Sequence, residues 1–357
     1  MVSSPRPIRV AYLCEYPTLL GGERSLLAFL DQSANQIDPV IVAPPSGRLA
    51  DALSHQSLPH LPADHLRLDP QSLVGLSQQL AAHHPQIIHA NSLSMRVPAI
   101  ELASQLGIPS VVHVRDIYRL SASQWRILQK ATALIAVSPA VGSFLAAGGI
   151  PPNQVHTIPN GINHNTPQKS SLALPGPPPH VACIGQMALR KGQDLFAQAA
   201  HIISQTGTNA TFLLIGERYS TKNESITLES QIHSTTSSMQ RAGRWFHLGY
   251  RDDVRAILPH LALVVVPSRQ EPLSRVAIEA LSAGVPVVAT DVGGNSFILD
   301  EGRGGYLTKP NPEAIAQAIV EVLSNLAKAT GVARVGQERA RDIFSITRHT
   351  QRVIDLY

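Results

Sequence analysis

The sequence is poor in cysteine, in aromatic residues and in clustered charge. Its 357 residues include only two cysteines, 4% aromatic residues and 15% charged residues. Cys14 and Cys183 each end an apolar stretch in a different half of the chain, so we expect buried thiols rather than a disulfide or a metal site. No segment is long and apolar enough to span a membrane, and no signal-peptide pattern precedes the first apolar stretch. The sequence therefore predicts a cytoplasmic protein.

The charge balance is basic but thinly spread. The net charge is +4 and the isoelectric point is near 9.2. Residues 1–160 hold ten Lys and Arg against nine Asp and Glu, without a basic run interleaved with aromatic residues. This pattern excludes nucleic acid as the expected partner, because a nucleic-acid surface concentrates positive charge. Peripheral contact with the inner face of a membrane stays open, although no basic amphipathic helix supports it.

Apolar, β-branched stretches alternate with helical patterns along the whole chain, which is typical of an α/β protein with doubly wound parallel sheets. A segment rich in proline and small polar residues, 167–179, separates two such halves and is expected to be a linker. The predicted strands are Ile8–Cys14, Pro39–Ala43, Ile87–Ala90, Ser110–Val114, Leu134–Ser138, Val181–Gly185, Thr211–Gly216, Trp245–Leu248, Leu261–Pro267 and Val285–Thr290.

The stretch from 267 to 294 places two glutamates around a helix start. Ser274 is a good N-cap for a helix over Arg275–Ala283, whose free N–H groups favour a phosphate after the preceding buried strand. A carboxylate beside a diphosphate is repelled by it, so Glu271 is best explained by hydrogen bonds to sugar hydroxyls. Glu279 lies one helical turn deeper and could hold a ribose diol. The alternative is that both glutamates are ordinary solvated residues, which the apolar neighbours of Glu279 disfavour.

The spacing from Glu271 to Glu279 resembles the E-x7-E signature of the retaining glycosyltransferases of family 4, which have the GT-B fold. The resemblance implies two Rossmann-like domains facing a central cleft: residues 1–166 for the acceptor and 180–343 for the donor, with a helix over 344–357 crossing back. It further implies that Glu271 contacts the donor sugar, that Glu279 contacts the ribose, and that the backbone of Leu273, Ser274, Arg275 and Val276 contacts the distal phosphate. Pro272 and Ser274 stand where the family usually has glycines.

Two adjacent cations follow a strand-end glycine in the second half. Arg190 and Lys191 come just after Gly185, and fixed cations there would stabilise the charge of a departing diphosphate. A solvated pair of surface charges is the alternative. The family usually has an arginine where this chain has Gln186, so we expect Arg190 or Arg275 to compensate, or the diphosphate to be held less strongly.

The first half offers weaker candidates at its strand ends. Gly21 and Gly22 precede an expected helix over Ser25–Leu30, and the resemblance places them at the donor phosphates and the acceptor. No G-x-G-x-x-G is present, which disfavours a nicotinamide or flavin enzyme. The resemblance places His113 beside the transferred sugar, although a lone histidine is more often structural. Asn91 and Arg115 are candidates for acceptor binding, and structural turn roles are expected for Asn160.

These observations predict a retaining glycosyltransferase that moves a sugar from a nucleoside diphosphate sugar, with UDP or GDP as the expected carrier, to an acceptor hydroxyl. Glu271, His113 and Lys191 are the expected catalytic residues. No metal or other cofactor is demanded, because cations of the chain neutralise the diphosphate. The acceptor could be a saccharide, a lipid or a small molecule. Two alternatives remain: a GT-B-like epimerase or synthase using the same donor, and a non-catalytic nucleotide-sugar-binding protein.

Overall fold

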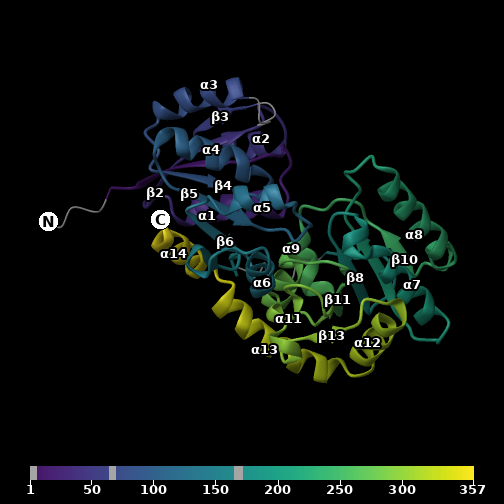
Figure 1. The fold of residues 1–357 in the computed structure, drawn as a ribbon. Helices are drawn as coiled ribbons and strands as arrows, with labels where there is room; N and C mark the ends of the chain where they lie inside the picture. Colours follow the sequence, from purple (N-terminus) through teal and green to yellow (C-terminus); the bar gives the residue numbers. More distant parts are fainter. Residues whose placement is uncertain (1–5, 64–69, 165–171) are drawn as a thin grey trace. The chain divides into compact units, whose positions relative to one another are not determined.

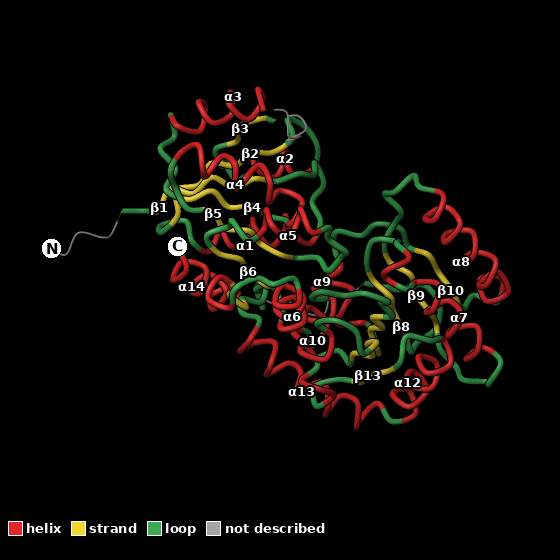
Figure 2. The backbone as a smooth tube through the Cα atoms, in the orientation of Figure 1, coloured by secondary structure: helices red, strands yellow, loops and turns green. Residues whose placement is uncertain are grey.

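The computed structural model describes residues 6–63, 70–164 and 172–357, which form two compact units. The first unit comprises Met1–Asn163 and Ser345–Tyr357, and the second comprises His164–Phe344. Each unit is a parallel sheet with helices on both faces, as the ribbon and the tube show (Figures 1 and 2). Part of the expected linker, residues 167–171, lies outside the described residues.

The first unit is built on a seven-stranded sheet in the order β3-β2-β1-β4-β5-β6-β7. Its strands are β1 (Ile8–Leu13), β2 (Ile37–Ala43), β3 (His60–Pro62), β4 (Ile87–Ala90), β5 (Ser110–Val114), β6 (Ala133–Ala136) and β7 (Val155–Thr157). Its helices are α1 (Gly21–Gln32), α2 (Arg48–His55), α3 (Pro70–Ala81), α4 (Arg96–Leu106), α5 (Ala122–Leu128), α6 (Pro139–Ala147) and α14 (Ile346–Leu356). Helix α14 packs against α1, so the end of the chain completes the first unit.

The second unit is built on a six-stranded sheet in the order β10-β9-β8-β11-β12-β13. Its strands are β8 (His180–Ile184), β9 (Thr211–Ile215), β10 (Trp245–His247), β11 (Leu263–Val266), β12 (Val287–Thr290) and β13 (Tyr306–Thr308). Its helices are α7 (Gln193–Ser204), α8 (Asn223–Arg241), α9 (Val254–Ile257), α10 (Arg275–Ser282), α11 (Asn295–Ile298), α12 (Pro312–Ser324) and α13 (Leu326–Ile343). Helices α7, α8 and α12 pack together, and α10 packs against α13.

The central strands of both sheets are buried along their length because both faces are covered by helices. The runs Val10–Leu13 and Leu263–Val266 are fully buried, which explains their continuous apolar sequence. Each strand expected from the sequence is present, with ends shifted by up to two residues. The strands that the sequence did not predict, β3, β7 and β13, are three-residue edge strands with partly exposed side chains, so they lack the apolar run that marks a central strand.

Helix α1 differs from its prediction. It begins at Gly21 rather than Ser25, so the glycine pair lies in the first helical turn and not in a preceding loop. The carboxylate of Glu23 accepts the backbone N–H of Leu20 at 3.2 Å, and the hydroxyl of Ser25 donates to the Gly21 carbonyl at 2.8 Å. These two side chains satisfy backbone groups at the helix start and extend the helix over a stretch that composition alone marks as a turn.

The two cysteines are free and buried, as the sequence predicted. Among the described residues, no helix is both long and apolar enough to cross a bilayer.

Candidate functional site

The strand order of the second unit reverses between β8 and β11, and we call the position at the carboxyl ends of these two strands the β8–β11 crevice. From β8 the chain moves outward to β9 and β10, then returns to β11 on the other side of β8. The loops after β8 and β11 therefore leave in opposite directions, and ligands of open α/β sheets bind at the carboxyl ends of such strands. The loop after β8 carries Lys191, and the loop after β11 carries Glu271.

Lys191 and Glu271 meet across this crevice. The Nζ of Lys191 donates to Oε2 of Glu271 at 2.6 Å, and the hydroxyl of Ser268 donates to the same oxygen at 3.0 Å. The Glu271 side chain is only 3% exposed, whereas the Lys191 side chain is 24% exposed. A buried carboxylate is costly without a partner, so the pair holds a negative charge inside the protein while the Lys191 side chain stays partly exposed.

Close backbone contacts fix the two loops against each other. A Cβ at Gly192, which has a φ of +71°, would lie 1.9 Å from the carbonyl oxygen of Pro267. A Cβ at Gly293 would lie 2.1 Å from the carbonyl oxygen of Glu271, which also accepts the N–H of Gly294. Only glycine permits these approaches, so both positions hold the loop that carries Glu271.

A second ion pair joins the loop after β11 to the segment after β8. The guanidinium of Arg269 forms two hydrogen bonds with the carboxylate of Asp194, at 2.7 and 2.6 Å. This pair raises the pKa of Arg269 through hydrogen bonding to Asp194. Two parallel bonds fix orientation better than one, so the pair ties the strand-end loop of β11 to the start of α7.

Helix α10 begins beside Glu271, as the sequence predicted. The hydroxyl of its N-cap, Ser274, accepts the N–H of Ala277 at 3.3 Å. The N–H groups of Arg275 and Val276 lie in the first turn, where no earlier helical carbonyl is available to them. Arg275 donates to Glu279 at 3.0 Å, and both side chains are largely buried. Leu273 is buried immediately before the helix.

The remaining candidates of the second unit lie in the loop after β8. Gly185 has a φ of +148° and its carbonyl would lie 2.0 Å from a Cβ at Gly216, so this loop is packed against the end of β9. Arg190 is exposed, and its carbonyl accepts the N–H groups of Arg269 and Gln270. Of the two adjacent cations, it is Lys191 that pairs with Glu271.

The first unit reverses its strand order in the same way between β1 and β4, and an arginine surrounded by polar side chains lies at the strand ends there. Arg115, after β5, donates from Nε to the carbonyl of Asn91 at 3.0 Å and from Nη2 to the amide oxygen of Asn91 at 3.2 Å. Its Nη1 donates to the amide oxygen of Asn160, after β7. Its Nη2 also lies 3.0 Å from Nδ1 of His113. The structure thus brings together Asn91, His113 and Arg115, which the sequence singled out separately.

His113 is one of three buried imidazoles that lie close together in the first unit. The ring of His113 lies 5.6 Å from that of His89 and 6.3 Å from that of His349, measured between centroids. Burial lowers the pKa of His89 to about 3 and that of His349 to about 4, and it lowers the pKa of His113 well below its usual value. The positive charge of Arg115 acts in the same direction on all three. The imidazoles are therefore neutral at physiological pH.

Sequence reasoning missed the residues that α14 contributes. Nδ1 of His349 lies 2.8 Å from the carbonyl of Pro159, and the hydroxyl of Tyr357 lies 2.5 Å from Nδ1 of His89 and 3.2 Å from the hydroxyl of Tyr12. These partners are separated by 190 to 345 positions in the chain. No local pattern indicates such contacts, although the family resemblance implied that a helix over 344–357 returns to the first domain.

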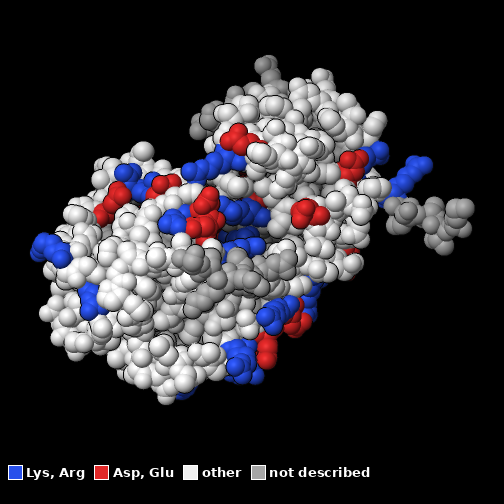
Figure 3. Space-filling view, turned by 180° about the vertical axis from the view of Figure 1, so that it is seen from behind, with Lys and Arg blue, Asp and Glu red and all other residues white. Residues whose placement is uncertain are grey.

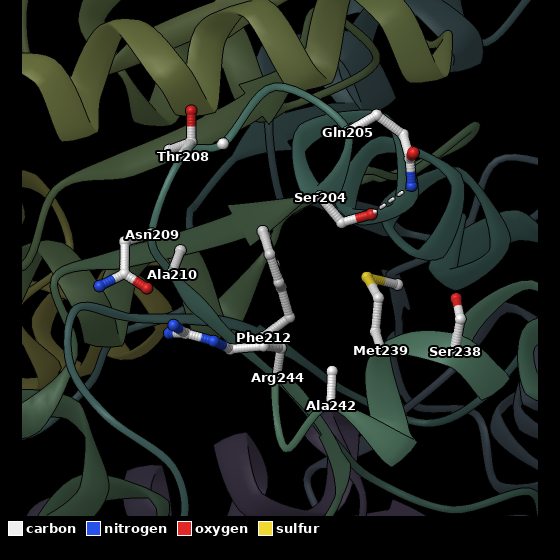
Figure 4. Close-up of a pocket in the computed structure, with 11 residues that line it drawn as sticks. Ser204, Gln205, Thr208, Asn209, Ala210, Phe212, Ser238, Met239, Ala242 and Arg244 are labelled. Carbon is white, nitrogen blue, oxygen red and sulfur yellow. Dashed lines mark hydrogen bonds between the residues drawn. The ribbon is translucent and has the colours of Figure 1, made fainter.

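The rest of the described surface has fewer features that indicate a functional site. A cavity of about 450 Å³ lies at the amino ends of β9 and β10, lined by Ser204, Asn209, Met239 and Arg244 among others (Figure 4). It lies at the edge of the sheet opposite to Lys191 and Glu271. On the face drawn in Figure 3, acidic and basic side chains lie beside one another and much of the surface carries neither. Within the described ranges, no group of three potential ligands is arranged to hold a metal ion.

Comparisons with known proteins agree with this architecture. The family model described as Glycosyltransferase Family 4 matches residues 20–166, and the model described as Glycosyl transferases group 1 matches residues 178–325. The crystal structure of Anabaena Alr3699/HepE in complex with UDP-glucose has a TM-score of 0.85 and 21% identity, covering 98% of this chain and 99% of that chain. The fold is therefore that of the GT-B enzymes.

Two curated relatives bear on the family. Spore coat protein SA of Bacillus subtilis is 25% identical over 180 residues, which span 50% of this chain and 48% of that protein. The UDP-Gal:alpha-D-GlcNAc-diphosphoundecaprenol alpha-1,3-galactosyltransferase of Escherichia coli is 22% identical over 389 aligned positions, covering 100% of this chain and 98% of that protein. With both halves of the chain matched by its models, the protein belongs to family 4 of the glycosyltransferases.

Proposed function

We propose that the chain transfers a sugar, with retention of anomeric configuration, from a nucleoside diphosphate sugar to an acceptor hydroxyl. The observation that carries this proposal is the pair of Lys191 and Glu271 at the β8–β11 crevice, beside the amino end of α10. The solved structure of Alr3699/HepE is a complex with UDP-glucose, and the name of the E. coli relative includes UDP-Gal. A uridine diphosphate sugar is therefore the first donor class to test.

The two charges suit the two ends of such a donor. Lys191, whose side chain is partly exposed, offers a cation to the diphosphate, and the first-turn N–H groups of α10 add a positive electrostatic potential. The charge of Glu271 is already balanced by Lys191, and Ser268 donates a further hydrogen bond to it, which reduces its repulsion of the diphosphate. Its carboxylate can then accept hydrogen bonds from hydroxyls of the sugar.

The proposed reaction proceeds on one face of the sugar. The bond between the anomeric carbon and the diphosphate oxygen breaks as an oxocarbenium-like ion forms, and the acceptor oxygen bonds to the same face. The departing diphosphate takes the proton of the acceptor hydroxyl. Lys191 and the start of α10 stabilise the negative charge that develops on the diphosphate, which is the effect that lowers the barrier most.

Two exposed aromatic rings in the first unit suggest a saccharide as the acceptor. Tyr16 and Tyr118 are 52% and 41% exposed, and they follow β1 and β5, the two neighbours of β4. Burial and a hydrogen bond to Glu15 raise the pKa of Tyr16 to about 12. Aromatic rings with polar groups beside them are suited to a ligand that has both apolar C–H faces and hydroxyls.

The test is binding followed by product analysis. A ligand at about one hundred times its dissociation constant adds roughly 2.7 kcal/mol of stability, so a matching donor should raise the melting temperature by about 5–10 °C. We expect one nucleoside diphosphate and its sugars to stabilise the protein selectively. Mass analysis with saccharide acceptors then separates transfer from epimerisation and hydrolysis. A folded protein that no nucleotide stabilises would contradict the proposal and favour a non-catalytic role.

A further inference from the structure

The contact between Arg115 and His113 determines where the proton of this imidazole lies. Nη2 of Arg115 is 3.0 Å from Nδ1 of His113. A guanidinium group can only donate hydrogen bonds, so Nδ1 must accept and cannot carry a proton. The neutral ring therefore has its proton on Nε2. A protonated ring is disfavoured, because burial and then the charge of Arg115 lower the pKa of His113.

The guanidinium is held in this orientation from two other strand ends. Asn91, after β4, accepts through both its backbone carbonyl and its side-chain oxygen, and Asn160, after β7, accepts from Nη1. The first turn of α1 lies over the same side chain, since a Cβ at Gly22 would lie 3.4 Å from Cδ of Arg115. Arg115 therefore does not rotate freely, and its donor to His113 is fixed in place.

The other nitrogen of His113 is buried without a hydrogen-bond partner among the described residues. His113 as a whole is 2% exposed. Buried donors in folded proteins are nearly always paired, so an unpaired N–H at the carboxyl edge of a sheet calls for a ligand. The imidazoles of His89 on β4 and His349 on α14 pack against the His113 ring, and both also lower the pKa of His113.

We propose that Arg115 is a positioning residue that fixes the proton of His113 on Nε2, so that the contact of this ring with the transferred sugar, which the family resemblance implies, is made by an Nε2–H donor to an oxygen of the bound substrate. The geometry excludes His113 as the general base, because the lone pair of Nδ1 is committed to Arg115 and Nε2 has none to offer. The inference rests on the proposed glycosyl transfer only for the identity of that oxygen, which would belong to a sugar hydroxyl. The tautomer itself is a property of the isolated protein.

The direct test is nitrogen NMR of protein carrying labelled imidazoles, recorded without substrate. We expect the His113 signals to report a neutral ring with the proton on Nε2 from pH 6 to pH 8, and to shift toward mixed tautomers in Arg115→Met. Arg115→Lys, which keeps a donor, should preserve the tautomer in part. The exposed neighbour Arg119 provides a control, since Arg119→Met should leave the signals unchanged. A proton on Nδ1 in the native protein, or an unchanged tautomer in Arg115→Met, would overturn the proposal.

The functional test uses two amides that imitate the two ring nitrogens. The amide group of glutamine reaches the position of Nε2, whereas that of asparagine reaches the position of Nδ1. We expect His113→Gln to keep kcat within about tenfold of the native value, and His113→Asn and His113→Ala to lose about 100-fold, the scale of one oriented donor. Equal losses in all three folded variants would mean that a donor at Nε2 is not what His113 supplies.

The two tests separate the failure of this inference from failure of the proposed function. If no sugar transfer is found, the NMR result still decides whether Arg115 sets the tautomer of His113. If transfer occurs but the proton of His113 is found on Nδ1, only the proposed roles of Arg115 and His113 are contradicted. If the tautomer is right and His113→Gln is the most active of the three variants, both parts stand.

Discussion

The crevices of the two units occupy the same place in two similar sheets but are lined by different chemistry. Between β8 and β11, the polar groups are ions: Lys191 with Glu271, and Arg269 with Asp194. Between β1 and β4, the guanidinium of Arg115 is hydrogen-bonded to two asparagines and lies beside the neutral imidazole of His113, and the buried carboxylate of Glu23 is near it. The same topology thus supplies strand ends in both cases, and the side chains there give the two crevices different chemistry.

The ion pair of the second unit should give the strongest response to mutation. Both Lys191→Met and Glu271→Gln should lower kcat by about 100-fold or more, because each removes a group proposed to contact the donor. Their effects on stability should differ. Lys191→Met leaves the buried carboxylate of Glu271 without its cation and should cost about 2–4 kcal/mol, whereas Glu271→Gln leaves unpaired a lysine whose side chain is partly exposed and should cost less.

A double-mutant cycle tests the coupling within this pair. Lys191→Met/Glu271→Gln should be more stable than Lys191→Met alone, as measured by urea unfolding, because the unpaired carboxylate is gone. The matched control is the exposed pair of Lys328 and Glu321, 3.4 Å apart, where the same changes should cost less than about 1 kcal/mol. Additive effects at Lys191 and Glu271 would show that the two charges do not support each other.

The next largest effects are expected from glycine substitutions, whose cost in stability should differ between the two units. Gly192→Ala should destabilise the second unit by more than about 2 kcal/mol, since the new methyl group would collide with the carbonyl of Pro267 at a positive φ. Gly22→Ala places a methyl group in a helical turn at ordinary contact distance from Arg115, so folding should be unchanged or slightly favoured.

Gly207 provides the control for these substitutions. It has a φ of +78°, but a Cβ placed on it would meet no atom within 4 Å, so Gly207→Ala should show only the backbone cost of about 1 kcal/mol. A folded Gly22→Ala protein that had lost transfer activity would support the proposed contact of this glycine with substrate. An equally stable Gly192→Ala protein would contradict the close packing of the two loops.

The response to acid should also distinguish the units. The folded first unit keeps His89, His113 and His349 neutral, with lowered pKa values of about 3 for His89 and about 4 for His349, whereas the unfolded chain protonates near pH 6.5. Below pH 6.5 the unfolded state binds more protons, so the free energy of unfolding should fall between pH 6.5 and 4, by up to about 1.4 kcal/mol per pH unit for each histidine.

The two tryptophans allow the pH dependence of unfolding to be measured for each unit separately. Trp125 lies in the first unit and Trp245 in the second, so Trp245→Phe and Trp125→Phe variants report unfolding of one unit each. The loss of stability in acid should be concentrated in the unfolding reported by Trp125. His349→Gln should reduce the dependence of that free energy of unfolding on pH. His83→Gln, which alters an exposed histidine, is the control and should not. Equal slopes in both signals would contradict a special role for the buried imidazoles.

The weakest response should come from the exposed rings proposed to meet the acceptor. Tyr16→Ala and Tyr118→Ala should raise the KM for a saccharide acceptor several-fold and leave donor affinity unchanged, since each residue is about half exposed. Val74→Ala, which shortens another exposed apolar side chain of the first unit, is the control. A change in donor affinity instead would mean that these rings belong to the donor site.

Local sequence patterns were enough to predict the central strands and the helix that follows β11. Buried parallel strands read as apolar, β-branched runs, and a serine before a helix reads as a cap, so β11, Ser274 and α10 followed from the sequence. Short edge strands such as β7 lacked that pattern because one side of an edge is only partly covered. Local hydrogen bonds of Glu23 and Ser25 also moved the start of α1 beyond what composition indicated.

Which strand-end residues act together depends on the folded arrangement of the sheets. The sequence named Lys191 and Glu271 separately, and their 2.6 Å contact depends on β8 and β11 being neighbours. Nothing in the local pattern indicated that Arg115 would fix a nitrogen of His113, or that His349 would close the first unit from α14. The physical reason is range: propensity and periodicity act over one or two turns, whereas a site is assembled from loops that only sheet order and helix packing bring together.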